Sequence, residues 1–255
     1  MRLIARGVGK RFGPLAVLED ISFEVGPGEI VAVVGPSGCG KSTLLRILGG
    51  LERADAGNVE TMGEAPAASL NPITYVFQDF ALLPWRSVID NVAFALEHRV
   101  ADGARRREMA AQALDALGLA GFHDAYPRQL SGGMKQRVGL ARAMAVKPAI
   151  LLMDEPLSAL DAQTRELFMA DLAGLLSREP FAGVYVTHNL DEAALLARRI
   201  VVLSRRPGRV RRVFEIATPL AARRADDPDI VALRRAIWEE LRADAAAADR
   251  EILDA

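Results

Sequence analysis

The sequence lacks two features of extracellular or membrane-spanning proteins. Its 255 residues include a single cysteine, Cys39, so an intramolecular disulfide framework is excluded and a reducing compartment fits the composition. The longest apolar runs, such as IVAVVG and AILLM, are far shorter than the ~18 residues that a membrane-spanning helix needs. Both absences favour an ordinary globular protein that does not itself span a membrane.

The sequence also has no excess of charge of either sign. Lysine and arginine number 32 and aspartate and glutamate 33, which gives a formal net charge of -1. Proteins that bind nucleic acid usually present a net basic face, so this balance gives no general reason to expect nucleic acid as a partner. The first residues, MRLIARGVGKRFG, contain no apolar run of signal-peptide length. We therefore expect a cytosolic chain that reaches a membrane through a partner.

Strand-like and helix-like patterns alternate along the chain. Residues 29–35 and 149–155 are continuous apolar runs typical of strands buried on both faces, and 41–50 is typical of a helix ended by glycines. Strands that alternate with helices indicate an α/β fold with a largely parallel sheet. Further strands are expected at 3–5, 21–25, 73–78, 181–188, 200–205 and 210–216, and further helices at 161–179 and 191–199.

Two regions depart from this alternation. From 87 to about 146 the segments are mostly helical, which indicates a subdomain inserted into the α/β domain. Near the C-terminal end, Pro228 follows acidic residues that could cap a helix. Apolar residues then recur at helical spacing, at Ile230, Leu233, Ile237 and Leu241. This pattern predicts an amphipathic helix, and packing on its own domain is the interpretation that we favour.

The segment GPSGCGKST has the pattern of a phosphate-binding loop, or P-loop. It follows a buried strand and opens a helix, which is the context that the pattern requires. Backbone N–H groups of such a loop surround the α- and β-phosphates, Lys41 would neutralise the β- and γ-phosphates, and Ser42 would bind Mg²⁺. The alternative is a glycine-rich turn with an exposed lysine. The expected nucleotide-binding residues are Gly35, Pro36, Ser37, Gly38, Cys39, Gly40, Lys41, Ser42 and Thr43.

An acidic pair completes the chemistry of this site. ILLMDE places Asp154 and Glu155 at the C-terminal end of a buried strand, where open α/β sheets bind ligands. Asp154 can hold Mg²⁺, directly or through water, and Glu155 is then free to polarise an attacking water. Alone, the pair could be a strand that ends in solvated acids. Beside a P-loop in the same sheet, it indicates hydrolysis of a nucleoside triphosphate.

The motifs GPSGCGKST, LSGGMKQR, ILLMDEPLSALD and VTHN occur in this order. In this combination the chain, from about residue 3 to 212, resembles the ATP-binding subunits of ABC transporters. The resemblance implies a P-loop NTPase fold with a mixed, largely parallel central sheet, an N-terminal antiparallel β subdomain and an inserted helical subdomain. It also implies an ATP-binding domain over 1–225, a helical tail over 226–255, and ATP with Mg²⁺ as cofactors.

The segment LSGGMKQR contains some parts of a phosphate-binding loop but not all of them. Ser131, Gly132 and Gly133 begin a helix and offer a hydroxyl, backbone N–H groups and a positive helix end to an anion. The segment has no lysine at the P-loop position and no Mg²⁺ ligand. The resemblance implies that this half-site closes over the γ-phosphate held by the P-loop of another subunit, in a head-to-tail homodimer. A helix cap without a ligand is the alternative.

The resemblance assigns further residues one by one. Phe12 occupies the place where an aromatic ring stacks on adenine, although a core phenylalanine at a turn would look the same. Gln78 matches a glutamine that meets Mg²⁺ and the attacking water and senses the transmembrane partner, or it simply ends a strand. His188 would contact the γ-phosphate, and Asp161 ends a loop that crosses between subunits. The expected catalytic residues are Lys41, Gln78, Glu155 and His188.

The segment ALLPW is the expected contact with a membrane protein. Its leucines could be core residues, but Trp85 beside Arg86 favours a partner surface. This segment and SRRPGRV resemble the branch of importers for nitrate, sulfonate and taurine. The resemblance implies a peripheral protein on the cytoplasmic face of the cell membrane, with two copies of a transmembrane permease and, indirectly, a periplasmic or extracellular solute-binding protein.

Two other ABC ATPase classes remain as alternatives. A DNA-repair clamp would carry long coiled-coil insertions, but the sequence has no sustained heptads. An ATPase of a soluble assembly, such as iron–sulfur biogenesis, would lack an apolar loop for a permease. Co-purification with a multispanning membrane protein separates the importer from both.

Overall fold

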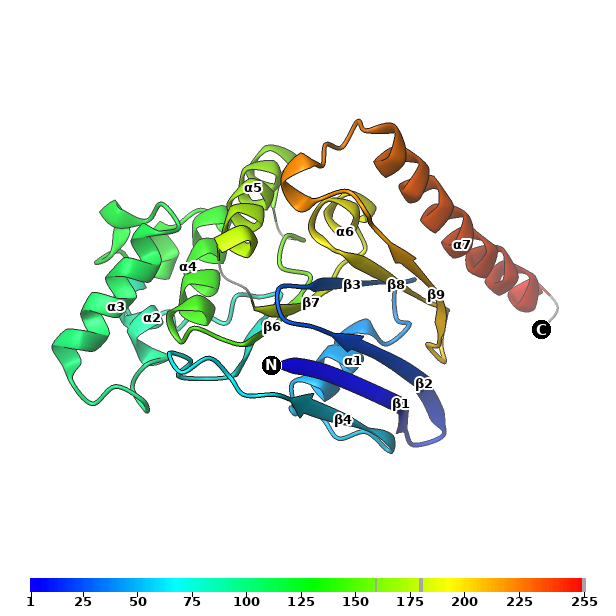
Figure 1. Ribbon diagram of the computed structural model, residues 1–255, viewed down its shortest axis with the longest axis horizontal. Coiled ribbons are helices and arrows are strands. Elements are labelled where there is room, and N and C mark those ends of the chain that lie inside the picture. Colours follow the sequence, from blue (N-terminus) through cyan, green and yellow to red (C-terminus); the bar gives the residue numbers. More distant parts are fainter. Residues whose placement is uncertain (159, 179–180, 254–255) are drawn as a thin grey trace.

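The chain forms two β-sheets with helices between and around them (Figure 1). The computed structural model describes residues 1–158, 160–178 and 181–253. The main sheet has the strand order β5-β6-β7-β3-β8-β9, and the smaller sheet has the order β2-β1-β4. The strands are β1 (Arg2–Phe12), β2 (Leu15–Val25), β3 (Ile30–Val34), β4 (Ala56–Met62), β5 (Ile73–Val76), β6 (Ile150–Asp154), β7 (Ala182–Val186), β8 (Arg199–Leu203) and β9 (Val210–Glu215).

The main sheet is mixed and largely parallel, whereas the smaller sheet is antiparallel. In the main sheet, β9 pairs antiparallel with β8, and the other neighbouring pairs run parallel. Strands β3, β6 and β7 are buried along their whole length. A sheet covered on both faces has no solvated side, which is why these strands are continuous apolar runs rather than alternating ones.

Helix α1 (Lys41–Leu48) lies between the two sheets (Figure 1). Its leucines Leu44 and Leu45 are fully buried in one apolar cluster with side chains of both sheets, such as Val8 and Val33. Burial of apolar side chains contributes about 1.5–3 kcal/mol each, so this packing fixes the start of α1. The P-loop, which enters α1, is therefore attached to a rigid element.

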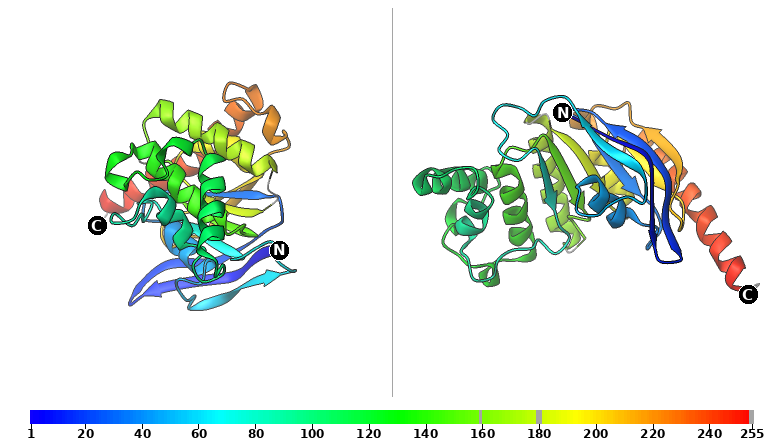
Figure 2. Two further views of the ribbon diagram at one scale, coloured as in Figure 1. Left: turned by 90° about the vertical axis from the view of Figure 1, so that its left-hand side faces the viewer. Right: turned by 90° about the horizontal axis from the view of Figure 1, so that it is seen from below.

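The remaining helices cover the opposite face of the main sheet and extend beyond its edge (Figures 1 and 2). Side-chain caps fix several starts: Ser87, Asp102 and Ser131 each accept a hydrogen bond from a backbone N–H of the following turn. These helices are α2 (Val88–Phe94), α3 (Gly103–Asp115), α4 (Gly132–Ala145), α5 (Ala162–Arg178) and α6 (Leu190–Leu196), with short 3₁₀ turns at Ala120–Phe122, Pro127–Gln129 and Leu220–Ala222.

A long helix, α7 (Pro228–Leu253), ends the described chain and extends away from the sheets (Figures 1 and 2). Near its start, Ile230 and Ile237 are buried against α6 and β8. Further along, the Glu240 carboxylate accepts a hydrogen bond from Arg212 of β9 at 3.0 Å. Within the described residues, no helix combines the length and the apolar character that crossing a membrane requires.

The expected fold class is confirmed, with differences in detail. Strands β1 and β2 are longer than predicted, because bulges interrupt their pairing and hide the alternation of side chains. Strand β4 was missed, because AGNVETM is a mostly exposed edge strand without an apolar pattern. Helix α2 ends at Phe94 rather than at Arg99. The last residue of the helix predicted at 161–179 and the last two of the tail lie outside the described residues.

Candidate functional site

Four adjacent strands of the main sheet lead into the residues that the motifs single out. Strand β3 leads into the P-loop, β7 into His188, β6 ends at Asp154, and β5 leads to Gln78. These four strands are parallel neighbours, so their carboxyl ends meet at one edge. Ligands of open α/β sheets bind at this edge. The fold thus gathers segments that are more than a hundred residues apart in the sequence.

The P-loop is held in shape by its own backbone and by β2. Gly40 has a φ of 105°, and a Cβ there would lie 2.7 Å from Leu18 Cδ2, so the position requires glycine. The buried Lys41 ammonium donates hydrogen bonds to the carbonyl oxygens of Gly35 at 2.8 Å and Pro36 at 3.0 Å. An ammonium has three donors, so one remains for a phosphate oxygen.

The other residues of the loop divide between exposed and buried positions. Ser37 and Gly38 are exposed at its tip, where their backbone N–H groups can meet an anion. Cys39 is 1% exposed and belongs to the apolar cluster between the sheets. Thr43 is half-buried in the first turn of α1. Cys39 therefore contributes packing beneath the loop rather than a group that faces a ligand.

The loop and the acidic pair are joined directly. Ser42 Oγ donates a hydrogen bond to Asp154 Oδ1 at 2.9 Å, and Tyr75 Oη donates to Asp154 Oδ2 at 3.0 Å. Burial and the neighbouring Asp154 carboxylate raise the pKa of Tyr75, so its hydroxyl stays protonated as a donor. Tyr75 was missed from the sequence, because a tyrosine in a strand gives no sign of the residue that it faces.

Glu155 and His188 lie beside each other. Glu155 has a φ of 43°, a left-handed conformation that costs a residue with a side chain of order 1 kcal/mol, and its N–H donates to Val186 O at 2.9 Å. This turn sets Glu155 Oε2 at 3.1 Å from His188 Nδ1. The His188 side chain is 62% exposed and that of Glu155 20%, so both can reach a ligand at the sheet edge.

Gln78 and Asp161 lie at the two sides of this cluster. Gln78 is exposed, and its Nε2 is 3.5 Å from Ser158 Oγ, which donates to Glu155 O at 3.0 Å. Asp161 accepts from the Thr164 N–H at 2.9 Å and the Thr164 hydroxyl at 2.8 Å, and so caps α5. These hydrogen bonds hold the pKa of Asp161 below its usual range. Its carboxylate is charged and exposed at neutral pH.

Phe12 is an exposed ring rather than a core residue. It is the last residue of β1, its side chain is 49% exposed, and the Lys10 ammonium lies 5.1 Å from the ring centroid. The strand that pairs with it, β2, supplies the Leu18 side chain that packs on Gly40 of the P-loop. The alternative of a core phenylalanine is wrong, because about half of the residue is open to solvent.

The segment Leu130–Arg137, which we call the signature segment, is connected differently. Ser131 is exposed and accepts from the Met134 N–H at 3.3 Å, so it caps α4. Gly133 is buried, and a Cβ there would lie 2.5 Å from Thr164 Cγ2 of α5. Within the described residues, no hydrogen bond or ion pair joins Ser131, Gly132 or Gly133 to the P-loop. The two glycine-rich segments do not form one site in a single chain.

The loop between β5 and α2 is ordered by buried polar side chains. The Arg142 guanidinium of α4 donates to Ala81 O and Phe80 O, both at 2.6 Å, and burial lowers its pKa. Asn91 is fully buried, and its amide bonds Leu83 N and several carbonyl oxygens of the loop. Trp85 in the same loop is 72% exposed. The aromatic ring is held out toward solvent by a rigid loop.

The residues at the sheet edge fit a magnesium nucleotide. The P-loop supplies glycines with positive φ, backbone N–H groups at its exposed tip and the ammonium of Lys41, which suit phosphate oxygens. Ser42 and Asp154 supply adjoining oxygen atoms, which suit Mg²⁺. Over residues 1–158, 160–178 and 181–253 there is no cluster of three or more His, Cys, Asp or Glu side chains that could hold a metal ion. Mg²⁺ commonly uses one or two protein ligands together with substrate phosphates, so this arrangement suffices.

A P-loop on a parallel sheet, bonded to an acidic pair at the next strand ends, defines a nucleoside triphosphatase of the P-loop class. Known proteins narrow this class. The family model described as ABC transporter matches residues 18–158. The chain belongs to the ABC transporter family, as an ATP-binding protein that hydrolyses ATP.

Relatives and solved structures cover most of the chain. It is 48% identical to the aliphatic sulfonates import ATP-binding protein SsuB 2 of Xanthomonas axonopodis pv. citri, over 88% of this chain and 73% of that protein. It is 44% identical to the taurine import ATP-binding protein TauB of Chromobacterium violaceum, over 89% and 88%. A similar solved structure is the dimeric structure of MJ0796, a bacterial ABC transporter cassette, with a TM-score of 0.74 and 32% identity over 85% of this chain and all of that one.

Proposed function

We propose that this chain is the energy-coupling subunit of an importer for nitrate, a sulfonate, taurine or a related small solute. The observation that carries the proposal is the connected site at the sheet edge, where Ser42 bonds Asp154 and Glu155 lies beside His188. The names of the similar proteins, which include a nitrate import ATP-binding protein of Synechocystis at 42% identity over 83% of this chain and 79% of that one, support the solute class.

The roles of the side chains follow from their positions. Lys41 and the N–H groups of the P-loop neutralise the phosphates of ATP, and Phe12 offers its exposed ring to the adenine. Glu155 accepts a proton from the attacking water, and His188 binds the γ-phosphate and holds the Glu155 carboxylate in place. Ser42, Asp154 and Gln78 would hold Mg²⁺, which lowers the cost of charge on the phosphates when it is bound.

The active form in this proposal is a homodimer. Among the described residues, no hydrogen bond joins the exposed Ser131 to the P-loop, and Ser37 and Gly38 leave the tip of that loop exposed. In a two-fold arrangement, Ser131, Gly132 and Gly133 of one chain close over the P-loop of the other, and Asp161 lies between the subunits. The dimeric cassette with 32% identity supports this arrangement.

Mixing two inactive variants tests the shared site. Lys41→Ala removes the P-loop cation, and Ser131→Arg fills the signature segment. A mixed dimer keeps one intact site, formed by the wild-type halves of each chain, so ATP should promote association in the mixture but not in either variant alone. Light scattering after size-exclusion chromatography measures this. Ala120→Arg, which adds the same charge at an exposed position of the helical region, is the control and should associate normally. A mixture that stays monomeric with ATP would contradict the shared site.

The partner surface for a transmembrane permease is the loop that carries Trp85. Trp85 is 72% exposed, and Phe94 of α2 is 40% exposed, with the Arg86 guanidinium 4.7 Å from the centroid of its ring. An exposed tryptophan on an ordered loop suits a buried contact with a second protein. The chain would then lie on the cytoplasmic face of the membrane, bound to two permease copies that receive solute from an external binding protein. The ATP-binding domain would span 1–225 with its helical insertion at about 87–146, followed by the tail 226–255.

Co-purification separates this proposal from a soluble assembly. Wild-type chain isolated from membranes should carry a multispanning protein, and Trp85→Ala should lose it while keeping its own ATPase activity. Trp238→Ala removes the other tryptophan, which is 59% exposed on α7, and should leave the complex intact. Recovery of the wild-type chain in a complex without a membrane protein would overturn the importer and favour a soluble ABC ATPase.

A further inference from the structure

A buried carboxylate lies between the two loops that flank the catalytic pair. Glu192 of α6 is 3% exposed, and its Oε2 accepts hydrogen bonds from Thr187 Oγ1 at 2.6 Å and Tyr185 Oη at 2.9 Å. Its other oxygen, Oε1, lies 3.6 Å from Nε of Arg165 on α5. Burying a carboxylate without partners is costly. The three partners Thr187, Tyr185 and Arg165 therefore stabilise the buried Glu192 carboxylate.

One end of this network holds the loop that carries His188. Thr187 precedes His188, and its hydroxyl both donates to Glu192 and accepts from the Asn189 N–H at 3.0 Å. The Asn189 side chain in turn accepts from the N–H groups of Asp191 and Glu192. Both neighbours of His188 are therefore fixed to the start of α6, which leaves the imidazole as the exposed group between them.

The other end of the network holds the loop that carries Asp161. The Arg165 guanidinium donates through Nη2 to Leu160 O at 2.9 Å. The backbone N–H of Arg165 donates to Asp161 O, also at 2.9 Å. The side chain of Arg165 thus joins the residue before Asp161 to the carboxylate of Glu192. Burial raises the pKa of Tyr185, the second donor to this carboxylate, so the donor keeps its proton.

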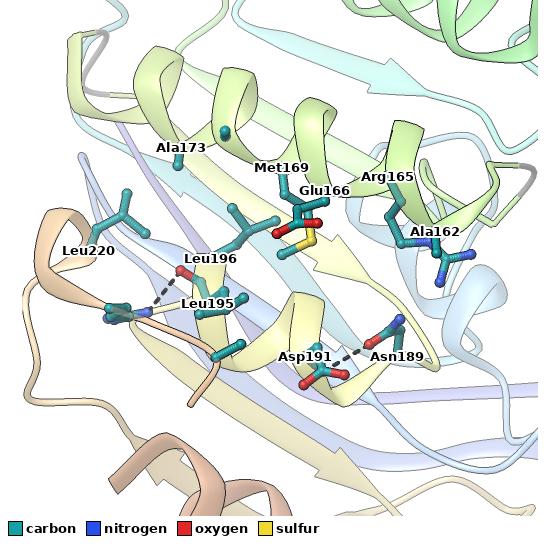
Figure 3. Close-up of a pocket in the computed structure, with 13 residues that line it drawn as sticks. Ala162, Arg165, Glu166, Met169, Ala173, Asn189, Asp191, Leu195, Leu196 and Leu220 are labelled. Carbon is teal, nitrogen blue, oxygen red and sulfur yellow. Dashed lines mark hydrogen bonds between the residues drawn. The ribbon is translucent and has the colours of Figure 1, made fainter. Parts of the chain in front are cut away.

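Residues of helices α5 and α6 line a cavity between the two helices (Figure 3). The cavity has a volume of about 370 Å³ and is lined by apolar side chains such as Met169, Leu195 and Leu196. Arg165 and Asn189 lie at the same end of it, next to the two loops (Figure 3). The ion pair between Arg165 of α5 and Glu192 of α6 connects the two helices directly through charged side chains.

The length of that ion pair makes it sensitive to the position of the loops. Arg165 Nε is buried and has no hydrogen-bond partner among the residues that the structure describes, and its 3.6 Å distance to Glu192 exceeds the usual hydrogen-bond distance by a few tenths of an ångström. A small shift of the start of α5 would close this gap. Movement of the Asp161 loop therefore changes the contact that holds the His188 loop, and the reverse holds equally.

We propose that Glu192 is a positioning residue of the ATPase site, which couples the loop of Asp161 to the loop of His188 through Arg165 and Thr187. This inference rests on the proposed role of His188 and Glu155 in hydrolysis. Glu192 touches neither the nucleotide nor the attacking water. It sets the place of the His188 imidazole, which lies 3.1 Å from the Glu155 carboxylate.

The test compares matched substitutions in the purified full-length chain. Glu192→Gln keeps the shape and one acceptor oxygen but removes the charge, and Arg165→Gln removes the other end of the link. Each should lower kcat about tenfold and leave KM for ATP within about twofold, because the binding loop is untouched. The double variant should lose no more than either single variant, since both changes break the same connection.

Two neighbouring acids serve as controls. Glu166→Gln changes an exposed carboxylate that lines the same cavity from α5, and Asp191→Asn changes the residue next to Glu192, which pairs with Arg234 of α7. Both should keep the wild-type kcat. Circular dichroism and Tm give the folded fraction of every variant, and kcat is compared per folded chain.

The outcomes separate this inference from the proposed function. If Glu155→Gln abolishes hydrolysis but Glu192→Gln and Arg165→Gln match Glu166→Gln, the coupling role is wrong and the catalytic site stands. Losses that multiply in the double variant, or that vanish when kcat is expressed per folded chain, would also overturn it. If Glu155→Gln keeps the wild-type turnover, the failure lies in the proposed function itself.

Discussion

The P-loop and the signature segment are both glycine-rich starts of helices, but their surroundings differ. Ser42 of the P-loop bonds Asp154, 112 positions away, whereas Ser131 of the signature segment bonds Met134, three positions away. Lys41 is buried with its donors on loop carbonyls, while Ser131 faces solvent. The difference fits the proposed homodimer, in which the signature segment of one chain completes the P-loop site of the other.

The two loops also need glycine for different physical reasons. Gly40 has a positive φ, which side chains disfavour, and a Cβ there would clash with Leu18. Glycine is therefore required at this position for its backbone conformation and for its lack of a side chain. Gly133 has an ordinary helical backbone and lies against Thr164 of α5. Its missing side chain lets two helices approach closely. The signature segment is therefore anchored to the helix that Asp161 caps.

The largest expected effect tests whether the P-loop side of the comparison, at the edge of the main sheet, carries the catalytic base. Glu155→Gln removes the carboxylate that would take a proton from water but keeps its volume. We expect hydrolysis to fall by about 10²–10⁴-fold, the usual contribution of a general base, with ATP binding retained. Phosphate release and nucleotide binding measured on the same sample check this, with Glu166→Gln as the control. Turnover close to that of the wild type would remove Glu155 from the role of base.

A smaller effect separates the packing role of Gly133 from phosphate binding. Gly133→Ala places a methyl group 2.5 Å from Thr164 Cγ2, and such overpacking typically costs about 1–3 kcal/mol of unfolding free energy. Thr164→Ser removes that methyl group and keeps the hydroxyl that bonds Asp161. The double variant should therefore recover most of the stability in urea unfolding.

The matched control for this rescue is in the other loop. Gly40→Ala meets Leu18 and also a φ of 105°, so shortening Leu18 to alanine should not restore its stability. If Gly133→Ala were as stable as the wild type, or if Thr164→Ser failed to rescue it, the close approach of α4 and α5 would not explain this glycine.

The smallest expected effect concerns Tyr75 and alkaline pH. The pKa of Tyr75 is raised in the folded chain, so its contribution is complete below pH 10, the ordinary tyrosine value, and declines as the pH rises toward the folded value. Tyr75 is partly exposed, so we expect its share of this decline to be no more than about 1 kcal/mol per pH unit. Between pH 9 and 11, the free energy of unfolding should fall less steeply with pH for Tyr75→Phe than for the wild type. Parallel curves for the two proteins would contradict the bond to Asp154 as the cause.

Much of the site could be read from local sequence because its parts are contiguous. GPSGCGKST between a buried strand and a helix, and DE at the end of another buried strand, indicate a P-loop and its acidic pair wherever they occur. The expected family, fold class and ATPase activity are confirmed. The residue roles and domain limits stay predictions. Strand β4, with no apolar pattern, gave no local signal.

The residues that were missed act across long distances. Tyr75 bonds Asp154 from a neighbouring strand, Arg142 holds the loop at Phe80 from another helix, and Glu192 joins two loops from α6. Each belongs to an ordinary helix or strand, where its residue type has no special spacing. The packing of helices and strands in the folded chain brings these side chains to their partners.

The sequence by itself determined the kind of chemistry, because each motif is a short run whose backbone and side chains act together. The tertiary structure decided how the motifs are connected: Ser42 to Asp154, Glu155 to His188, and Gly133 to Thr164. It also decided that Ser131 stays apart from the P-loop of its own chain. The physical reason is that hydrogen bonds and packing act over a few ångströms, and the distance between distant segments is set by the fold rather than by their separation in sequence.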